Sequence, residues 1–449
     1  MPISLQFLGA TGDVTGSSFL ARTDTQALLV DCGLFQGQRQ NRLHNLEPFG
    51  FNPKKIDFLI LTHAHLDHCG LIPKLYHQGF RGKIYCTPAT ADLTKAMLSD
   101  SAQIREHGVD DQQIENLFSY QDTLDSFKLF KPLSYNRTFT NGKIKIRLQD
   151  SGHILGSALI EIWAEDKKLV FTGDLGNSPV PILQDPTPIS EANYIISEST
   201  YGNRLHDPVD LREKKLIFAI EYAKKHSAKL IIPSFALERT QDLLYTLNQL
   251  KNQNKFSNLP VILDSPLASK ITAIYKKYTP LFDKEFQKQL KKDPNLFSFK
   301  EFRETVTKDE SKTLNDLTGP AIYIAGSGMA DAGRVQHHIL HQASNPNNQI
   351  LFVGFQVPGT LGRKLIDGAT RVRVLDHFVN IRAKVISINA FSAHADQKGI
   401  LNWLKNFKTK PTIFLVHGEE AARSALAGKI TRQLKFRTYL PKLKQTIVL

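Results

Sequence analysis

The most informative segment of this chain reads Thr62-His63-Ala64-His65-Leu66-Asp67-His68-Cys69-Gly70. Because His63 and His65 are two residues apart, extended backbone directs both imidazoles to the same side. Asp67 and His68 follow where the chain turns toward a helix, so they can serve a second, adjacent ion. Imidazole and carboxylate groups suit Zn²⁺. A lone histidine here would be interpreted as a hydrogen-bonded turn residue, whereas this cluster predicts a metal site.

Two residues further along the chain can complete that site. His153 lies between Gly152 and Gly156, and Asp174 follows an apolar segment that ends at Phe171. Glycine neighbours let the backbone approach a metal closely. A carboxylate has two oxygens and is costly to bury alone, so Asp174 is expected to bridge two cations.

The order of apolar segments predicts one domain interrupted by another. The first two hundred residues alternate β-rich segments with turns: Ala27–Val30, Ile56–Leu61, Lys83–Cys86, Lys143–Leu148, Ala158–Trp163 and Lys168–Phe171. From about Asp207, longer helices alternate with buried strands, which is typical of a parallel, doubly wound sheet. The segment 282–317 is polar and is expected to be irregular. Strands at 384–388 and 412–416 then precede histidines again, which indicates a return to the metal-binding domain.

Composition sets the broad class of the protein. Of the 449 residues, 41% are apolar and 22% charged, as in globular proteins. The N-terminus has no basic region typical of a signal peptide, and no segment approaches the length of a membrane helix. The cysteines Cys32, Cys69 and Cys86 lack CxxC spacing and are expected to be reduced. We therefore expect a cytoplasmic protein with no membrane partner.

The net charge of +14 favours a polyanionic partner. Residues 381–449 contain thirteen Lys and Arg against three acidic residues. On charge alone, a solvated surface and a phosphate-binding surface remain equally good interpretations.

The cluster at 63–68, with His153 and Asp174, resembles the metal-binding pattern of the metallo-β-lactamase superfamily. Val30-Asp31-Cys32-Gly33 resembles its upstream aspartate motif, in which the residue at the position of Asp31 orients metal ligands. A turn-forming aspartate is the alternative for Asp31.

Three later motifs resemble the β-CASP family of that superfamily. Ser197–Gly202 resembles its motif A, Phe391–Asp396 its motif B and Leu415–Glu419 its motif C. A histidine in motif C, here His417, is typical of the RNA-cutting branch. The implied fold class is α/β: a metallo-β-lactamase αββα sandwich at 1–206 and 379–449, interrupted by an inserted β-CASP domain with a parallel α/β sheet at 207–378.

The resemblance also implies the roles of individual residues. One Zn²⁺ would be bound by His63, His65 and His153, and a second by Asp67, His68 and His417, with Asp174 between them. The catalytic group would comprise His394 as proton donor, Glu198 as its partner, and Asp67. Contacts to RNA phosphates are expected from Arg239, Ser327, Gly328, Thr360 and Arg363. The chain departs from the family at Glu238, where a glycine is usual.

The activity implied is hydrolysis of single-stranded RNA by a hydroxide that two metal ions activate, leaving 5′-phosphate and 3′-hydroxyl ends. Cleavage is expected to be endonucleolytic; additional 5′–3′ exonuclease activity and a homodimer are left open. The alternatives are a DNA nuclease, a thioester or lactam hydrolase, and a non-catalytic RNA-binding scaffold. Small-substrate hydrolases lack such an insert, and scaffolds lose metal ligands that are present here.

Overall fold

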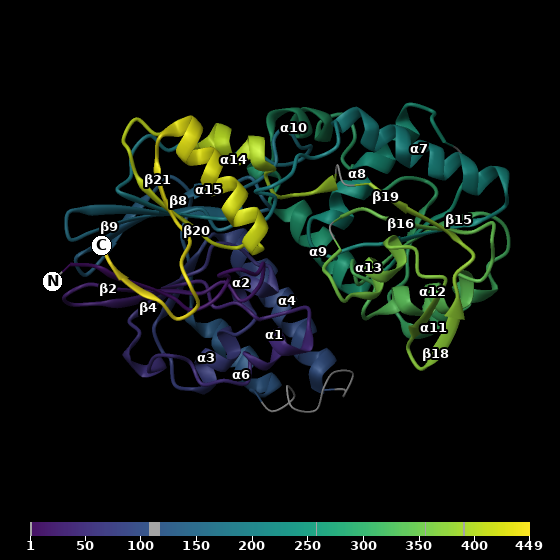
Figure 1. The fold of residues 1–449 in the computed structure, drawn as a ribbon. Helices are drawn as coiled ribbons and strands as arrows, with labels where there is room; N and C mark the ends of the chain where they lie inside the picture. Colours follow the sequence, from purple (N-terminus) through teal and green to yellow (C-terminus); the bar gives the residue numbers. More distant parts are fainter. Residues whose placement is uncertain (1, 107–116, 257, 355, 389–390) are drawn as a thin grey trace. The chain divides into compact units, whose positions relative to one another are not determined.

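The computed structural model describes residues 2–106, 117–256, 258–354, 356–388 and 391–449, and it divides the chain into two compact units. The first unit comprises residues 1–205 and 393–449, and the second comprises residues 206–392 (Figure 1). One unit is thus inserted into the sequence of the other, as the sequence predicts.

Two seven-stranded sheets form the centre of the first unit. The first sheet has the order β22-β1-β2-β3-β4-β5-β6. Its strands are β1 (Ser4–Phe7), β2 (Phe19–Arg22), β3 (Ala27–Val30), β4 (Phe58–Ile60), β5 (Lys83–Cys86), β6 (Phe130–Pro132) and β22 (Thr446–Val448). The second sheet has the order β21-β20-β11-β10-β9-β8-β7. Its strands are β7 (Thr138–Asn141), β8 (Ile144–Asp150), β9 (Ala158–Ala164), β10 (Lys167–Phe171), β11 (Tyr194–Ser197), β20 (Thr412–Leu415) and β21 (Arg437–Tyr439).

The two sheets pack face to face with helices outside them, as a four-layer α/β/β/α sandwich. Alternate side chains of a strand face the core between the sheets and the helix layer. On β9, Ile160 and Ile162 pack into the core between the sheets, whereas Leu159 faces the helix side. Period-two alternation of this kind directs successive side chains to opposite faces. Helices cover both outer faces: α1 (Arg39–Leu43), α2 (Leu66–Cys69), α3 (Ile72–His77), α4 (Pro88–Glu106), α6 (Tyr120–Ser126), α14 (Gln397–Leu404) and α15 (Glu420–Leu434), with 3-10 turns η1 (Pro53–Lys55) and η2 (Phe127–Leu129). Cys32, Cys69 and Cys86 are free thiols in the core beneath the first sheet.

The second unit contains a six-stranded, wholly parallel sheet in the order β14-β13-β15-β12-β16-β19. Its strands are β12 (Lys229–Pro233), β13 (Val261–Asp264), β14 (Phe302–Glu304), β15 (Ala321–Ala325), β16 (Gln349–Phe352) and β19 (Lys384–Ser387). A separate hairpin pairs β17 (Arg371–Val374) with β18 (His377–Asn380). The helices and 3-10 turns are α7 (Val209–Lys225), α8 (Arg239–Asn252), α9 (Pro266–Lys277), η3 (Thr279–Leu281), α10 (Lys284–Leu290), α11 (Lys308–Thr313), η4 (Leu314–Asp316), α12 (Arg334–Gln342) and α13 (Leu361–Ile366).

Two details differ from the sequence-based expectation. The second boundary between the compact units lies between residues 392 and 393, because β19 pairs with β16 of the inserted sheet. The sequence predicts this boundary at 378/379. The segment 282–317, expected to be irregular, contains α10, β14 and α11. β14 is a three-residue edge strand with two exposed residues, so no apolar pattern marks it. None of the helices in the described part of the chain has the length and apolar character needed to span a membrane.

Candidate metal centre

The predicted metal ligands converge because each follows the end of a strand. His63 and its neighbours follow β4, and His153 lies in the turn between β8 and β9. Asp174, Glu198 and His417 follow β10, β11 and β20, three adjacent strands that pair in parallel. Because the carboxyl ends of parallel strands meet at one edge of a sheet, these three residues lie together.

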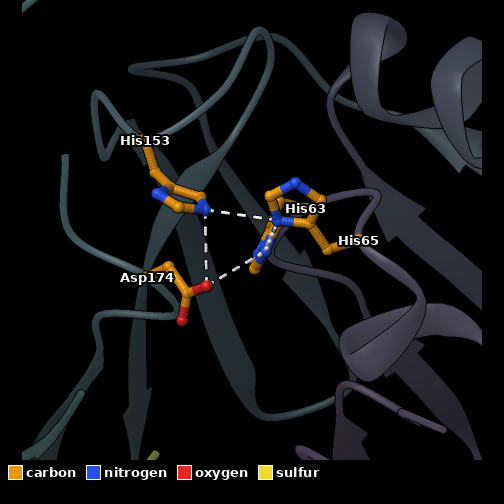
Figure 2. A group of neighbouring side chains, drawn as sticks. All are labelled: His63, His65, His153 and Asp174. Atoms are coloured by element: carbon orange, nitrogen blue, oxygen red, sulfur yellow. Dashed lines mark hydrogen bonds and ion pairs between the residues drawn. The ribbon is translucent and has the colours of Figure 1, made fainter. Parts of the chain in front are cut away.

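A first group consists of His63, His65, His153 and Asp174 (Figure 2). Nδ1 of His65 lies 3.1 Å from Nε2 of His63 and 3.3 Å from Nε2 of His153. Oδ2 of Asp174 lies 3.4 Å from Nε2 of His63 and 3.4 Å from Nε2 of His153. Figure 2 shows all four groups directed at one point.

A second group consists of Asp67, His68 and His417. Nε2 of His417 lies 3.2 Å from Nε2 of His68 and 3.2 Å from Oδ2 of Asp67. The other oxygen of Asp174, Oδ1, lies 3.4 Å from Nε2 of His68. Asp174 therefore presents one oxygen to each group.

The chemistry of these groups fits bound cations. Ligand atoms about 2.0–2.1 Å from one tetrahedral ion lie about 3.3 Å from one another, which agrees with the spacing in the first group. Oδ1 of Asp174 is buried and makes no hydrogen bond among the described residues, where the imidazoles of His68 and His417 approach it only to 3.4 and 3.6 Å. A buried carboxylate oxygen without a donor is costly unless a cation approaches it. The two groups can therefore hold two metal ions that share Asp174.

Burial leaves the histidines of the first group neutral at pH 7. It lowers the pKa of His63 to about 3, that of His65 to about 4, and that of His153 well below its usual value. Neutral imidazole is the form that binds a metal.

The pKa values of the histidines in the second group shift in the opposite direction. Burial acts to lower the pKa of His68, but the carboxylates of Asp174 and Asp31 raise it well above its usual value. Burial likewise acts to lower the pKa of His417, but the carboxylates of Asp174 and Asp67 raise it above its usual value. Protons and metal ions therefore compete for these nitrogens.

Asp31 lies directly behind the second group. It is fully buried, and its Oδ2 lies 2.7 Å from Nδ1 of His68. Thr62 donates its backbone N–H to Oδ1 of Asp31 (2.8 Å) and its hydroxyl to Oδ2 (2.9 Å). The carboxylate thus holds the His68 ring with Nε2 directed at Asp174 and His417.

His394 and Glu198 form a pair beside the first group. Nδ1 of His394 lies 3.2 Å from Oε1 of Glu198 and 3.8 Å from Oδ2 of Asp174. Burial acts to lower the pKa of His394, but these two carboxylates raise it to about 9. The backbone N–H of Leu175 donates to Oε1 of Glu198 (2.6 Å) and fixes the carboxylate. At pH 7 the imidazole is therefore protonated and held in place.

The sequence analysis missed the residues that hold His417. The hydroxyl of Thr200 lies 3.1 Å from Nδ1 of His417. The backbone N–H of His417 donates to the carbonyl of Ala10 (2.7 Å), in the loop that follows β1. In that loop a Cβ on Gly9 would lie 1.8 Å from the carbonyl oxygen of Gly16. The three glycines between residues 9 and 16 were the sequence signal for this close approach.

The residues predicted to contact phosphate all lie in the second unit: Arg239, Ser327, Gly328, Thr360 and Arg363. Thr360 caps α13 by accepting the backbone N–H of Arg363 (3.2 Å). The guanidinium of Arg363 pairs with Asp367 at 2.9 Å, and the N–H of Ser327 donates to the carbonyl of Ala332 (2.9 Å). Thr360, Arg363 and Ser327 thus already have intramolecular partners, and the contact of the five predicted residues with phosphate stays a prediction.

The αββα sandwich with two adjoining ligand groups at its strand ends defines a metallo-hydrolase. Comparison with known families agrees: residues 11–234 match the metallo-β-lactamase superfamily, residues 240–365 the β-CASP domain, and residues 379–441 the Zn-dependent metallo-hydrolase RNA specificity domain.

Individual relatives place the chain more narrowly. It is 36% identical to a ribonuclease from Thermus thermophilus over 94% of both chains. It is 30% identical to an RNase J-like protein from Methanocaldococcus jannaschii over 98% of both chains, and 30% identical to the transcription termination factor FttA of that organism over 98% of this chain and 70% of FttA. The chain belongs to the β-CASP ribonuclease family of the metallo-β-lactamase superfamily.

A crystal structure of a protein of unknown function from Enterococcus faecalis shares the fold, with a TM-score of 0.58 and 12% identity over the whole of both chains.

Proposed function

We propose that this chain is a two-zinc ribonuclease that cleaves single-stranded RNA internally. The observation that carries the proposal is the position of Asp174, which presents one carboxylate oxygen to each ligand group. Nitrogen and oxygen ligands at tetrahedral spacing favour Zn²⁺.

We assign the ligands by group. His63, His65 and His153 would hold one ion, Asp67, His68 and His417 the other, and Asp174 both. Two ions bound there would supply an acidified water as nucleophile and neutralise the charge that develops on the phosphate.

The proposed role of His394 follows from its charge. When the phosphodiester bond breaks, the leaving 3′-oxygen needs a proton, which an imidazolium can donate. Glu198 orients the ring and keeps it protonated at pH 7, since the pKa of His394 is about 9. Proton donation by a positioned acid typically accelerates such a step by about 10²- to 10⁴-fold.

Three observations support RNA as the substrate. They are His417 in motif C, the match of residues 379–441 to an RNA specificity domain, and relatives that are themselves named ribonucleases. The Lys and Arg excess after residue 381 suits a phosphate backbone. We further propose action in the cytoplasm, where three buried free thiols stay reduced.

The test uses one single-stranded RNA labelled separately at each end. Internal cleavage should give complementary fragments with 5′-phosphate and 3′-hydroxyl ends, because water attacks phosphorus and the 2′-hydroxyl is not the nucleophile. A single 2′-deoxy substitution at the scissile nucleotide should slow cleavage only modestly. Cyclic 2′,3′-phosphate ends, or complete protection by that substitution, would overturn the mechanism.

A further inference from the structure

The connections of the parallel sheet in the second unit change direction beside the start of α8, where Arg239 lies. From β12 the chain continues through α8 to β13, toward the β14 edge of the sheet. From β16 it continues in the opposite direction along the strand order, to β19 at the other edge. Ligands of open α/β sheets bind outside the carboxyl ends of two neighbouring strands whose connections diverge in this way. β12 and β16 are such neighbours.

Arg239 is the first residue of α8, which follows the carboxyl end of β12. Its side chain is only 8% exposed. Nε and Nη1 of its guanidinium are buried without a hydrogen-bond partner among the described residues. A permanently charged group with unused donors is costly to bury unless an anion satisfies it.

Nε of the guanidinium adjoins a glycine that follows the neighbouring strand. Gly354, just after β16, has no side chain, and a Cβ added there would lie 3.8 Å from Nε of Arg239. The N-terminus of the fourteen-residue helix α8 adds its positive dipole end at the same place. Arg239 and the helix thus point independently to a negatively charged ligand.

Glu238 interferes with this site. Its φ is +68°, in the left-handed region that favours glycine, which explains why glycine is usual here in the family that the sequence resembles. Its Oε2 lies 3.5 Å from Nη2 of Arg239. This chain therefore accepts backbone strain to place a carboxylate against the arginine.

We propose that Arg239 and the start of α8 form a phosphate-binding site, and that Glu238 is an internal competitor that a phosphate group must displace from Arg239. The inference rests on the proposed function for the source of the phosphate, which is either the terminal 5′-phosphate or an internal phosphodiester of RNA. Glu238 then sets how tightly this chain holds RNA at that position.

The first experiment measures binding of inorganic phosphate to the full-length, metal-loaded chain by calorimetry. Glu238→Gly should tighten binding by about tenfold, since one charge-assisted interaction no longer competes. Glu238→Gln, which keeps the side-chain size and the strained backbone but removes the charge, should act in the same direction. Adding Arg239→Gln to the Glu238→Gly chain should abolish the gain.

Two results would overturn the site: equal phosphate affinity in the native and Glu238→Gly chains, or a gain that survives Arg239→Gln. Glu238→Gly relieves the left-handed strain, so folding should not limit the test. Arg239→Lys, which keeps the charge, should retain part of the gain.

The second experiment compares KM for RNAs with a 5′-phosphate or a 5′-hydroxyl. If the terminal phosphate binds, Glu238→Gly lowers KM only for the phosphorylated RNA; if a phosphodiester binds, it lowers both. Unchanged KM for both would overturn RNA as the source of the phosphate. A chain that binds inorganic phosphate as expected but cleaves no RNA would contradict the proposed function alone.

Discussion

Oδ2 of Asp31 lies 2.7 Å from Nδ1 of His68, and both side chains are almost completely buried. Asp31 has a φ of +60°, an uncommon conformation for a residue other than glycine, which the hydrogen bonds from Thr62 help to hold. The contact fixes the orientation of the His68 ring. In the proposed centre, Asp31 would orient His68 without belonging to either ligand group.

Asp31→Asn should therefore weaken metal binding without abolishing it. Loss of such an orienting carboxylate typically costs about 10- to 100-fold in metal affinity or activity. Titration against a competing chelator measures the change. Asp166→Asn, at an exposed turn with a similar φ of +59°, serves as the matched control and should bind metal normally.

His65→Ala and Asp174→Ala should each abolish cleavage and lower the zinc content. His65 belongs to one ligand group, whereas Asp174 faces both, so Asp174→Ala should lose more metal per chain. Elemental analysis of the purified variants tests this. Full activity in either variant would refute the centre.

His394→Ala should retain near-normal zinc while turnover falls by about 10²- to 10⁴-fold. The reason is that His394 pairs with Glu198 and is assigned as a proton donor, although with Asp174 and Glu198 it also forms a third group that could hold a metal ion. Parallel metal analysis and single-turnover cleavage separate the two effects. Loss of metal would identify His394 as a ligand instead of an acid.

The pH profile should report the ion pair between His394 and Glu198. A proton donor acts only when protonated, so activity that depends on it is present below its pKa, about 9, and is lost as pH rises through that value. Because Glu198 raises this pKa, Glu198→Gln should move the alkaline decline of kcat to lower pH. An unmoved decline would assign it to another group.

Asp264→Asn should destabilise the second unit by about 2 to 4 kcal/mol at pH 7. The buried carboxylate of Asp264 accepts hydrogen bonds from Thr305, Ser311, Arg334 and His338. Burial acts to raise its pKa, but these donors hold it well below the usual value.

The sign of the pH dependence follows from that lowered pKa. The stabilisation that the ionised carboxylate of Asp264 provides is complete above the pKa of this group in the unfolded chain, about 3.9. It is lost as pH falls below that value. Urea unfolding of the native and Asp264→Asn chains should therefore converge between about pH 5 and pH 2. Exposed Asp309→Asn is the control and should change little at any pH.

Local sequence was sufficient to single out the first residues of the candidate metal centre. The spacing of His63, His65, Asp67 and His68 reflects an extended segment that enters a turn. This geometry involves only residues close together in the sequence. The glycines around His153 and the apolar segment before Asp174 marked these two residues as further candidate ligands in the same way. The interrupted domain order also followed from the change of periodicity near Asp207.

Tertiary structure decided how distant residues meet. His417 reaches His68 across 349 residues because β20 pairs with β11 and the loop after β1 holds its backbone. The boundary at 392/393 depends on the pairing of β19 with β16, and the contact of Glu238 with Arg239 depends on a left-handed backbone at the start of α8. Strand order, loop closure and left-handed conformations are stabilised by burial and hydrogen bonds between segments remote in sequence, so no local pattern records them.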